Sequence, residues 1–284
     1  MLLDRNTYIG FSALLLVPLC FFKHIDSLKY SSVVALFSML YLVFLVIYYF
    51  ANPAAAGRKL FENLTPFAPN ISILPNLPIF VFAFTCHQNL FSIYNDLPRA
   101  RGRRINTVIT VSVSICATMY AIVGYLGYFT FGAGIDEDLL KDYPETVLVA
   151  IGRVGVVLNV LLSYPLQCHP ARTSLDGILA GIFPRLGEIT PLRLVLITQL
   201  VLVASYAVAL SVSELGLIFS IVGATGSVTI CYLLPGLLYY KVKAREGWTV
   251  RRIASVMLVL WGLTVMVSSL TATILASFGV LPRK

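Results

Sequence analysis

The sequence has few charged residues. Only 12% of its 284 residues are Asp, Glu, Lys or Arg, whereas 58% are hydrophobic and the mean hydropathy is +0.86. A soluble domain carries about twice that charged share, because its surface must face water. The scarcity of charge excludes a disordered regulator and a nucleic-acid-binding domain with a soluble basic face, despite a net charge of +8. We therefore expect an integral membrane protein whose main partner is the lipid bilayer.

The sequence also lacks the patterns of enzymes and metal sites. Its five cysteines form no Cys-x-x-Cys pair, and its three histidines show no metal-ligand spacing. It contains no Gly-x-Ser-x-Gly nucleophile turn, no phosphate-binding loop and no pair of carboxylates within an apolar run. We therefore expect no catalysis, no disulfide framework, no metal and no cofactor. The cysteines are interpreted as small buried hydrophobic residues.

Long uncharged runs predict the membrane spans. About 20 apolar helical residues cross the roughly 30 Å hydrocarbon core of a bilayer. The first run lacks a basic start and a small-residue cleavage site, so it is interpreted as a span and not as a signal peptide. The sequence thus predicts an all-α polytopic membrane protein with one transmembrane domain over residues 1–284. Its eight spans are expected near residues 8–22, 32–50, 77–97, 106–131, 147–168, 192–210, 215–240 and 253–278.

The basic residues are distributed unequally between the turns. Of the 21 Lys and Arg residues, 14 fall in turns after odd-numbered spans and six fall on the other side. Because Lys and Arg favour cytoplasmic turns, both termini of this chain are predicted to be non-cytosolic. The remaining one, Arg153, lies inside the fifth span and is expected to extend toward the acidic residues 136–145. Candidate glycosylation sites at Asn63 and Asn70 fall in a turn on the predicted non-cytosolic side.

Polar residues interrupt the third apolar run. Thr85, His87, Gln88 and Asn89 lie near its middle, where a lipid-facing helix would not tolerate them. One interpretation is a broken helix that lines a solute site, and the other is hydrogen bonding between helices. No Asp or Glu lies deep in any span, so His87 is the one group there that titrates near neutral pH and could link transport to protons.

Two further clusters contain helix-breaking residues. Gly223 and Gly226 in the seventh span favour close helix packing, with local unwinding as the alternative. Near the end of the fifth span, Pro165 and Pro170 are expected to end or kink the helix. The Ser163 hydroxyl and nearby carbonyls would then be available to a cation or substrate, although an ordinary membrane exit accounts for the pattern equally well.

Five ordered motifs together resemble those of the amino acid/auxin permease family, in particular its vacuolar amino-acid transporters and sodium-coupled neutral amino-acid transporters. The resemblance implies a leucine-transporter-like, inverted-repeat fold of the APC superfamily with eleven spans. The motif register matches spans four to eleven, so the chain is expected to be N-terminally truncated and to lack the first three helices. The motifs are Phe84–Asn89, Tyr94–Pro98, Gly127–Gly132, Ser163–Arg172 and Val222–Ser227.

The same resemblance implies a function. It predicts secondary active transport of neutral amino acids, coupled to H⁺ or Na⁺, in a vacuolar or other endomembrane. The alternative is a truncated, non-transporting isoform or gene-model fragment that acts at most as a binding or regulatory membrane protein. By position in the motifs, Ser163 would contribute to a cation site. The residues expected to face the substrate are Ala83, Phe84, Thr85, Cys86 and His87.

Overall fold

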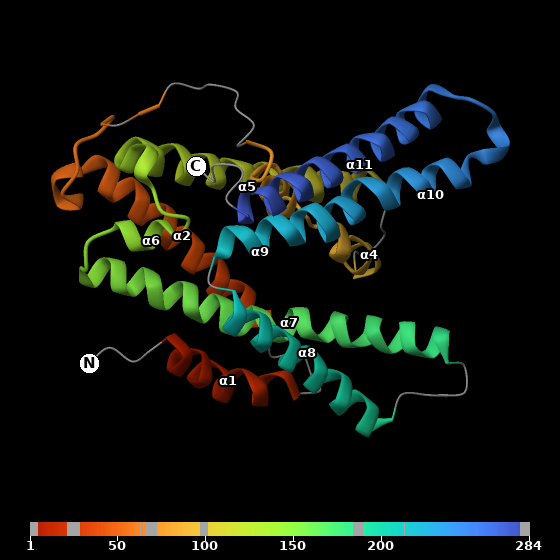
Figure 1. Cartoon of the computed structure of the whole chain (residues 1–284), viewed down its shortest axis with the longest axis horizontal. Helices are drawn as coiled ribbons and strands as arrows, with labels where there is room; N and C mark the ends of the chain where they lie inside the picture. The colour runs from red at the N-terminus through yellow and green to blue at the C-terminus, as the bar shows by residue number, and fades with distance from the viewer. Residues whose placement is uncertain are drawn as a thin grey trace. The chain divides into compact units, whose positions relative to one another are not determined.

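The chain folds into helices (Figure 1), and these belong to two compact units. The computed structural model describes residues 5–21, 29–62, 64–65, 73–96, 102–183, 190–212 and 214–278, and it contains no strand within these ranges. The first unit is drawn from Met1–Thr65 and Met119–Ser213, and the second from Pro66–Thr118 and Glu214–Lys284. Each unit therefore combines segments that are far apart in the sequence.

Four long helices build the first unit. In it α2 packs against α7, while α1 packs against both α7 and α8. These helices are apolar on all sides, as expected when the surrounding medium is lipid and not water. They are α1 (Arg5–Phe21), α2 (Lys29–Ala51), α7 (Val147–Ile182) and α8 (Pro191–Ser211).

The contact between α2 and α7 forms the best-buried core of this unit. Leu45 and Tyr49 of α2 are almost fully buried, as is Val149 of α7. The Tyr49 hydroxyl lies 2.8 Å from the Thr146 hydroxyl, which caps the start of α7. Gly152 allows the close approach, because a Cβ there would lie 3.3 Å from the Leu45 side chain. The core thus combines apolar packing with a satisfied polar end.

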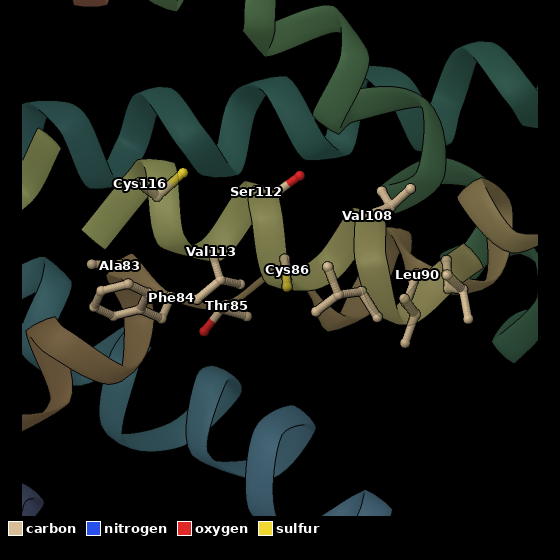
Figure 2. Close-up of a pocket in the computed structure, with 11 residues that line it drawn as sticks. Ala83, Phe84, Thr85, Cys86, Leu90, Val108, Ser112, Val113 and Cys116 are labelled. Atoms are coloured by element: carbon tan, nitrogen blue, oxygen red, sulfur yellow. The ribbon is translucent and has the colours of Figure 1, made fainter. Parts of the chain in front are cut away.

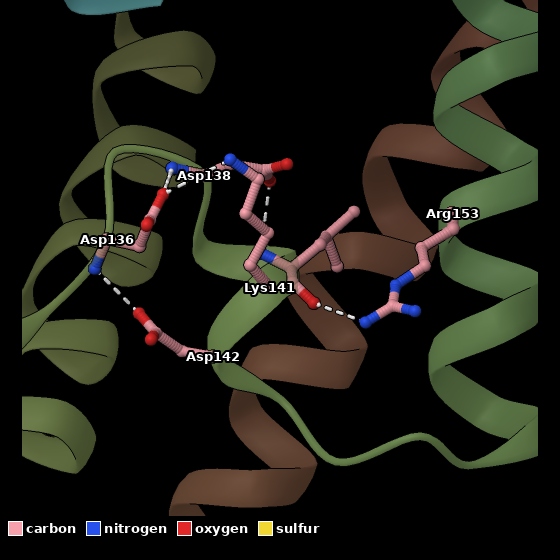
Figure 3. Close-up of polar contacts among 6 residues, drawn as sticks. Asp136, Asp138, Lys141, Asp142 and Arg153 are labelled. Atoms are coloured by element: carbon pink, nitrogen blue, oxygen red, sulfur yellow. Dashed lines mark hydrogen bonds and ion pairs between the residues drawn. The ribbon is translucent and has the colours of Figure 1, made fainter. Parts of the chain in front are cut away.

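A short polar turn precedes α7 in the first unit (Figure 3). It comprises η4 (Gly132–Gly134) and α6 (Leu139–Asp142), whose N-cap is the Asp138 side chain. The Asp136 carboxylate accepts a hydrogen bond from the Asp138 backbone N–H at 2.9 Å and lies 3.7 Å from Lys141. The hydrogen bond to Asp138 and the Lys141 charge lower the pKa of Asp136. These contacts therefore favour the folded turn above the acidic range and weaken as the pH falls through it.

The position of Arg153 confirms the expectation that it extends toward this turn. Its guanidinium donates a hydrogen bond of 3.0 Å to the Leu140 carbonyl of α6 (Figure 3). The bond is to a backbone carbonyl and not to one of the acidic side chains. A charge within the apolar part of α7 is thus placed against a polar group at the helix end.

The second unit contains the broken third apolar segment and the last two long helical segments. Residues 215–242 form one continuous segment made of α9, two π-helical stretches and α10, and it packs against α11. A Cβ added at Gly262 of α11 would lie 2.8 Å from the Cβ of Tyr232, so this helix contact requires a residue without a side chain. The elements are α3 (Leu77–Ala83), α4 (His87–Asp96), the first part of α5 (Gly102–Phe131), α9 (Leu215–Val222), η6 (Gly223–Ser227), η7 (Thr229–Leu233), α10 (Leu234–Val242), η8 (Ala244–Glu246) and α11 (Val250–Ser277). A further short 3₁₀ helix in the first unit is η2 (Pro53–Ala56).

Six helical segments among the described residues are long and apolar enough to cross a bilayer, which identifies a polytopic membrane protein. They cover residues 32–51, 102–134, 147–182, 191–211, 215–242 and 250–277. The other two predicted spans correspond to α1, which has 17 residues, and to the α3–α4 pair, which is interrupted. Helices suit a lipid environment because most of their backbone groups form hydrogen bonds within the helix.

Of the two expectations for the prolines, an end or a kink of the helix, the end is wrong and the kink stays a prediction. The helix continues through Pro165 and Pro170 to Ile182. Pro165 is buried, and the nearby Cys168 packs in a cluster with Cys20 of α1 and Leu202 of α8. Each proline removes one backbone donor but leaves the rest of the helix intact, and packing by neighbouring helices compensates for the loss.

Candidate functional site

The third apolar segment is broken in its middle, as its polar residues predicted. Helix α3 ends at Ala83 and α4 begins at His87, with non-helical residues 84–86 between them. The last carbonyls of α3 are satisfied locally. Phe84 N–H donates to Phe80 at 3.2 Å, and Thr85 donates from its N–H to Phe82 at 3.0 Å and from its hydroxyl to Val81 at 2.6 Å. The opposite end of the break is the N-terminus of α4, where backbone N–H groups have no partner within the helix.

A pocket of about 140 Å³ lies beside this break, inside the second unit (Figure 2). Val113 projects from α5 toward Phe84 and Thr85. No lining residue carries a charge, and most are apolar, so the pocket suits an uncharged group. It is lined by Ala83, Phe84, Thr85, Cys86, Leu90, Ile105, Val108, Ile109, Ser112, Val113 and Cys116.

The α5 wall of the pocket follows the helical repeat. Its six lining residues run from Ile105 to Cys116 at intervals of three and four residues, so they share one face of the helix. The sequence did not indicate this face, because apolar residues at helical spacing are also typical of a lipid-facing surface. The spacing of three and four residues around Ser112 is the signal that could have indicated this face of α5.

The segment after α9 approaches α3 closely. A Cβ at Gly223 would lie 2.2 Å from the Pro78 carbonyl oxygen, and the Ser220 hydroxyl donates to the Pro75 carbonyl at 2.8 Å. The surroundings of Gly223 are those that the packing interpretation requires. Gly226 has no atom within 4 Å of the position its Cβ would occupy, so close packing does not account for it. Both glycines lie in the π-helical stretch η6, and π-helical turns are frequent at functional sites.

A thiol connects the broken helix with η7. The Cys231 sulfur lies 3.2 Å from Nδ1 of His87 and 3.5 Å from the Thr85 hydroxyl. His87 is consequently directed toward η7 and does not line the pocket, whereas the four residues before it do. Cys231 was not identified from the sequence as a site residue, because a single cysteine in an apolar run has no distinctive pattern.

Ser163, the predicted cation ligand, lies in the first unit. Its half-buried hydroxyl donates to the Asn159 side-chain oxygen at 3.1 Å. Because Pro165 has no N–H, the Leu161 carbonyl has no backbone donor from the next turn of α7. Hydroxyl, amide and carbonyl oxygens are ligands of hard cations, and the assignment of Ser163 to a cation site stays a prediction.

The remaining site predictions concern glycosylation and metals. Asn63 and Asn70 lie outside the described residues. Within the part of the chain that the structure describes, His, Cys, Asp and Glu side chains form no group of three that could hold a metal ion, and all five cysteines are free.

Comparison with known proteins gives consistent matches over nearly the whole chain. The family model described as "Transmembrane amino acid transporter protein" matches residues 1–275. Vacuolar amino acid transporter 6 of Saccharomyces cerevisiae is 35% identical over 96% of this chain and 73% of its own length. Vacuolar amino acid transporter 5 of the same yeast is 33% identical, with 96% and 70% covered, and sodium-coupled neutral amino acid transporter 7 of Rattus norvegicus is 28% identical, with 86% and 53% covered. The chain therefore belongs to the family of transmembrane amino acid transporter proteins, which are membrane carriers and not enzymes.

Proposed function

We propose that this chain is a secondary active transporter that moves neutral amino acids across a vacuolar or related endomembrane. The observation that carries the proposal is the interrupted α3–α4 helix beside a pocket without charged lining residues. Broken helices at the middle of the membrane form the solute sites of many secondary transporters. The names of the relatives support an amino acid as substrate and the vacuole as compartment.

One end of the break matches the chemistry of an amino-acid carboxylate. The N-terminus of α4 carries the positive end of a helix dipole and N–H groups without a partner inside the helix, which favour the substrate's α-carboxylate. The substrate side chain would enter the pocket between Phe84 and α5. Since burying an unpaired charge there is costly, we expect Leu-like and Gln-like side chains to be preferred over those of Glu and Lys.

The coupling ion is H⁺ or Na⁺, and each has a named candidate group. His87 is the titratable side chain at the break, and its Nδ1 contacts Cys231. Ser163, with Asn159 and the Leu161 carbonyl, offers oxygen ligands to Na⁺. The leucine-transporter-like inverted-repeat fold is part of the same proposal, with the broken helix as its support.

Uptake of radiolabelled amino acids into proteoliposomes containing this chain tests the proposal. We expect saturable uptake of leucine or glutamine, with glutamate and lysine at least about tenfold slower, because a difference of about 1.4 kcal/mol in binding gives that factor. Val113→Trp, which fills the pocket, should abolish uptake. Ile115→Trp is the matched control, because Ile115 lies on the same helix, is 53% exposed and does not line the pocket. Absence of saturable uptake, or equal loss in both variants, would overturn the proposal.

The coupling ion is assigned by varying the gradient. His87→Gln should remove the pH dependence of uptake if protons drive transport. Ser163→Ala should remove stimulation by Na⁺ if sodium drives it. If uptake by the wild-type chain responds to neither gradient, the chain is not a secondary active transporter.

A further inference from the structure

The turn between α10 and α11 is built around a buried arginine. The Arg252 guanidinium lies 4.5 Å from the ring centre of Tyr240 and 4.8 Å from that of Trp248. It also donates to the Ala244 carbonyl at 3.3 Å and to the Gly247 carbonyl at 3.0 Å. The side chain is 9% exposed, so its contacts are made largely away from solvent. Cation–π contacts and hydrogen bonds from a charged donor are each favourable in such surroundings, and together they define the shape of the turn.

The backbone supports the same shape. Gly247 adopts a φ of 73°, a left-handed value that favours glycine, and Thr249 caps the start of α11 through its side chain. The turn therefore presents its outer side chains from a defined framework.

Those outer side chains are of two kinds. Lys241, Arg245 and Arg251 are exposed cations. Trp248 and Val250 are 69% and 83% exposed, although both are apolar. Glu246 is the one acidic residue in the sequence from 241 to 252, so the segment is strongly positive.

The chemistry of this surface fits the boundary between lipid and water. Helices α10 and α11 are apolar, so the turn that joins them lies at the edge of the hydrocarbon region. Tryptophan is enriched at that depth, where its ring contacts both acyl chains and headgroups. Each Lys or Arg beside an anionic leaflet contributes about 1 kcal/mol of attraction.

Two exposed basic residues elsewhere in the described chain have local partners. Lys141 is paired with Asp136, and the Arg58 guanidinium lies 5.9 Å from the Phe131 ring centre. In the α10–α11 turn the two aromatic rings hold Arg252, while Lys241, Arg245 and Arg251 are exposed.

We propose that the α10–α11 turn binds the phosphate headgroup of an anionic phospholipid. Lys241, Arg245 and Arg251 pair with the headgroup charge, while Trp248 and Val250 insert among the lipids at the interface. Arg252 holds the framework and does not bind the lipid. This site is separate from the pocket at the helix break, and it stands whether or not the chain transports amino acids.

Fluorescence quenching by brominated lipids tests the proposal directly. The chain has two tryptophans, so Trp261→Phe leaves Trp248 as the one remaining fluorophore. The full chain with this change is placed in bilayers containing either brominated phosphatidylserine or brominated phosphatidylcholine. We expect brominated phosphatidylserine to quench Trp248 at a mole fraction at least about fivefold lower than brominated phosphatidylcholine does. A difference of about 1 kcal/mol in binding corresponds to that ratio.

Two triple variants in the same background complete the test. Lys241→Gln, Arg245→Gln and Arg251→Gln together should abolish the preference for the anionic lipid. The matched control, Arg58→Gln with Lys59→Gln and Lys141→Gln, removes three basic residues from the predicted opposite side and should retain it. Size-exclusion chromatography establishes that both variants remain folded.

The outcomes separate a lipid site from a site for free anions. Equal quenching by both lipids, or an unchanged preference in the first triple variant, would overturn the proposal. Inorganic phosphate, added as a soluble competitor, should not reverse the preference. Reversal would show that the turn binds free anions, which also contradicts a lipid site.

Discussion

Gly223 and Gly226 lie in the same π-helical stretch but have different surroundings. Gly223 meets the Pro78 carbonyl, which belongs to the backbone and cannot rotate away. Gly226 has open space where a side chain would be. A methyl group on the Cα atom therefore does not fit at position 223 but does fit at position 226.

Gly223→Ala should destabilise the chain by about 1–3 kcal/mol, because overpacking forces the backbone to move. Gly226→Ala should be neutral or slightly stabilising, since alanine is preferred to glycine in helices by up to about 1 kcal/mol. Thermal unfolding in detergent measures both. Equal melting temperatures for the two variants would contradict the close contact between η6 and α3.

Arg252→Lys should also reduce stability, although the positive charge is kept. A lysine ammonium lacks the planar, multiply donating guanidinium that contacts both rings while donating to both carbonyls, so we expect a loss of about 1–2 kcal/mol. Arg251→Gln serves as the control for thermal unfolding, because Arg251 is exposed. A variant with lysine at position 252 that melts like the wild-type chain would show that the cation–π contacts are not stabilising.

At the scale of elements, the sequence indicated some helix breaks and not others. Thr85 and His87 in the middle of an apolar run predicted the gap between α3 and α4, because polar side chains that face lipid are energetically costly. Pro165 and Pro170 suggested an end or a kink in α7, and the helix continues through both. Local propensity predicts a break only where neighbouring helices do not supply packing, and that packing is not visible in a single segment.

The parts of the site that depend on tertiary contacts were harder to predict. Cys231 contacts His87 across a separation of 144 residues, and no pattern in either segment indicates the pairing. The two π-helical stretches were also not expected, because their backbone angles differ little from those of an α-helix.

Pro165 offers a test of how α7 takes part in ion coupling. Pro165→Ala restores a backbone donor to the Leu161 carbonyl, so that oxygen would no longer be available to a cation. We expect at least about a fivefold loss of Na⁺ stimulation if Na⁺ is the coupling ion, corresponding to about 1 kcal/mol. Pro170→Ala should leave the Na⁺ response intact, because it affects a carbonyl farther from Ser163. Equal Na⁺ dependence in both variants and the wild-type chain would argue against a role for the Leu161 carbonyl.

At the scale of the whole molecule, the unequal distribution of Lys and Arg predicts which turns face the cytosol. The α10–α11 turn falls on the basic side, and the turn around α6 falls on the other. The turn around α6 contains five acidic residues and one basic residue, Lys141, which pairs with Asp136.

Accessibility of single cysteines in sealed vesicles tests this topology. In a chain whose five native cysteines are replaced, Arg245→Cys should react with a membrane-impermeant maleimide from the cytosolic side. Lys141→Cys should react only after the membrane is permeabilised. Labelling of both from one side would refute the predicted orientation.

The two halves of the broken helix differ in the contacts that hold them. Helix α3 packs against α9, η6 and α11, whereas the main contact of α4 is with η7. Helices of 7 and 10 residues are too short to be stable alone, so each depends on its surroundings. The backbone amides of α3 should therefore exchange hydrogen for deuterium more slowly than those of α4. A substrate that binds at the N-terminus of α4 would order the less protected half, and the slowing of exchange would be confined to one side of the break.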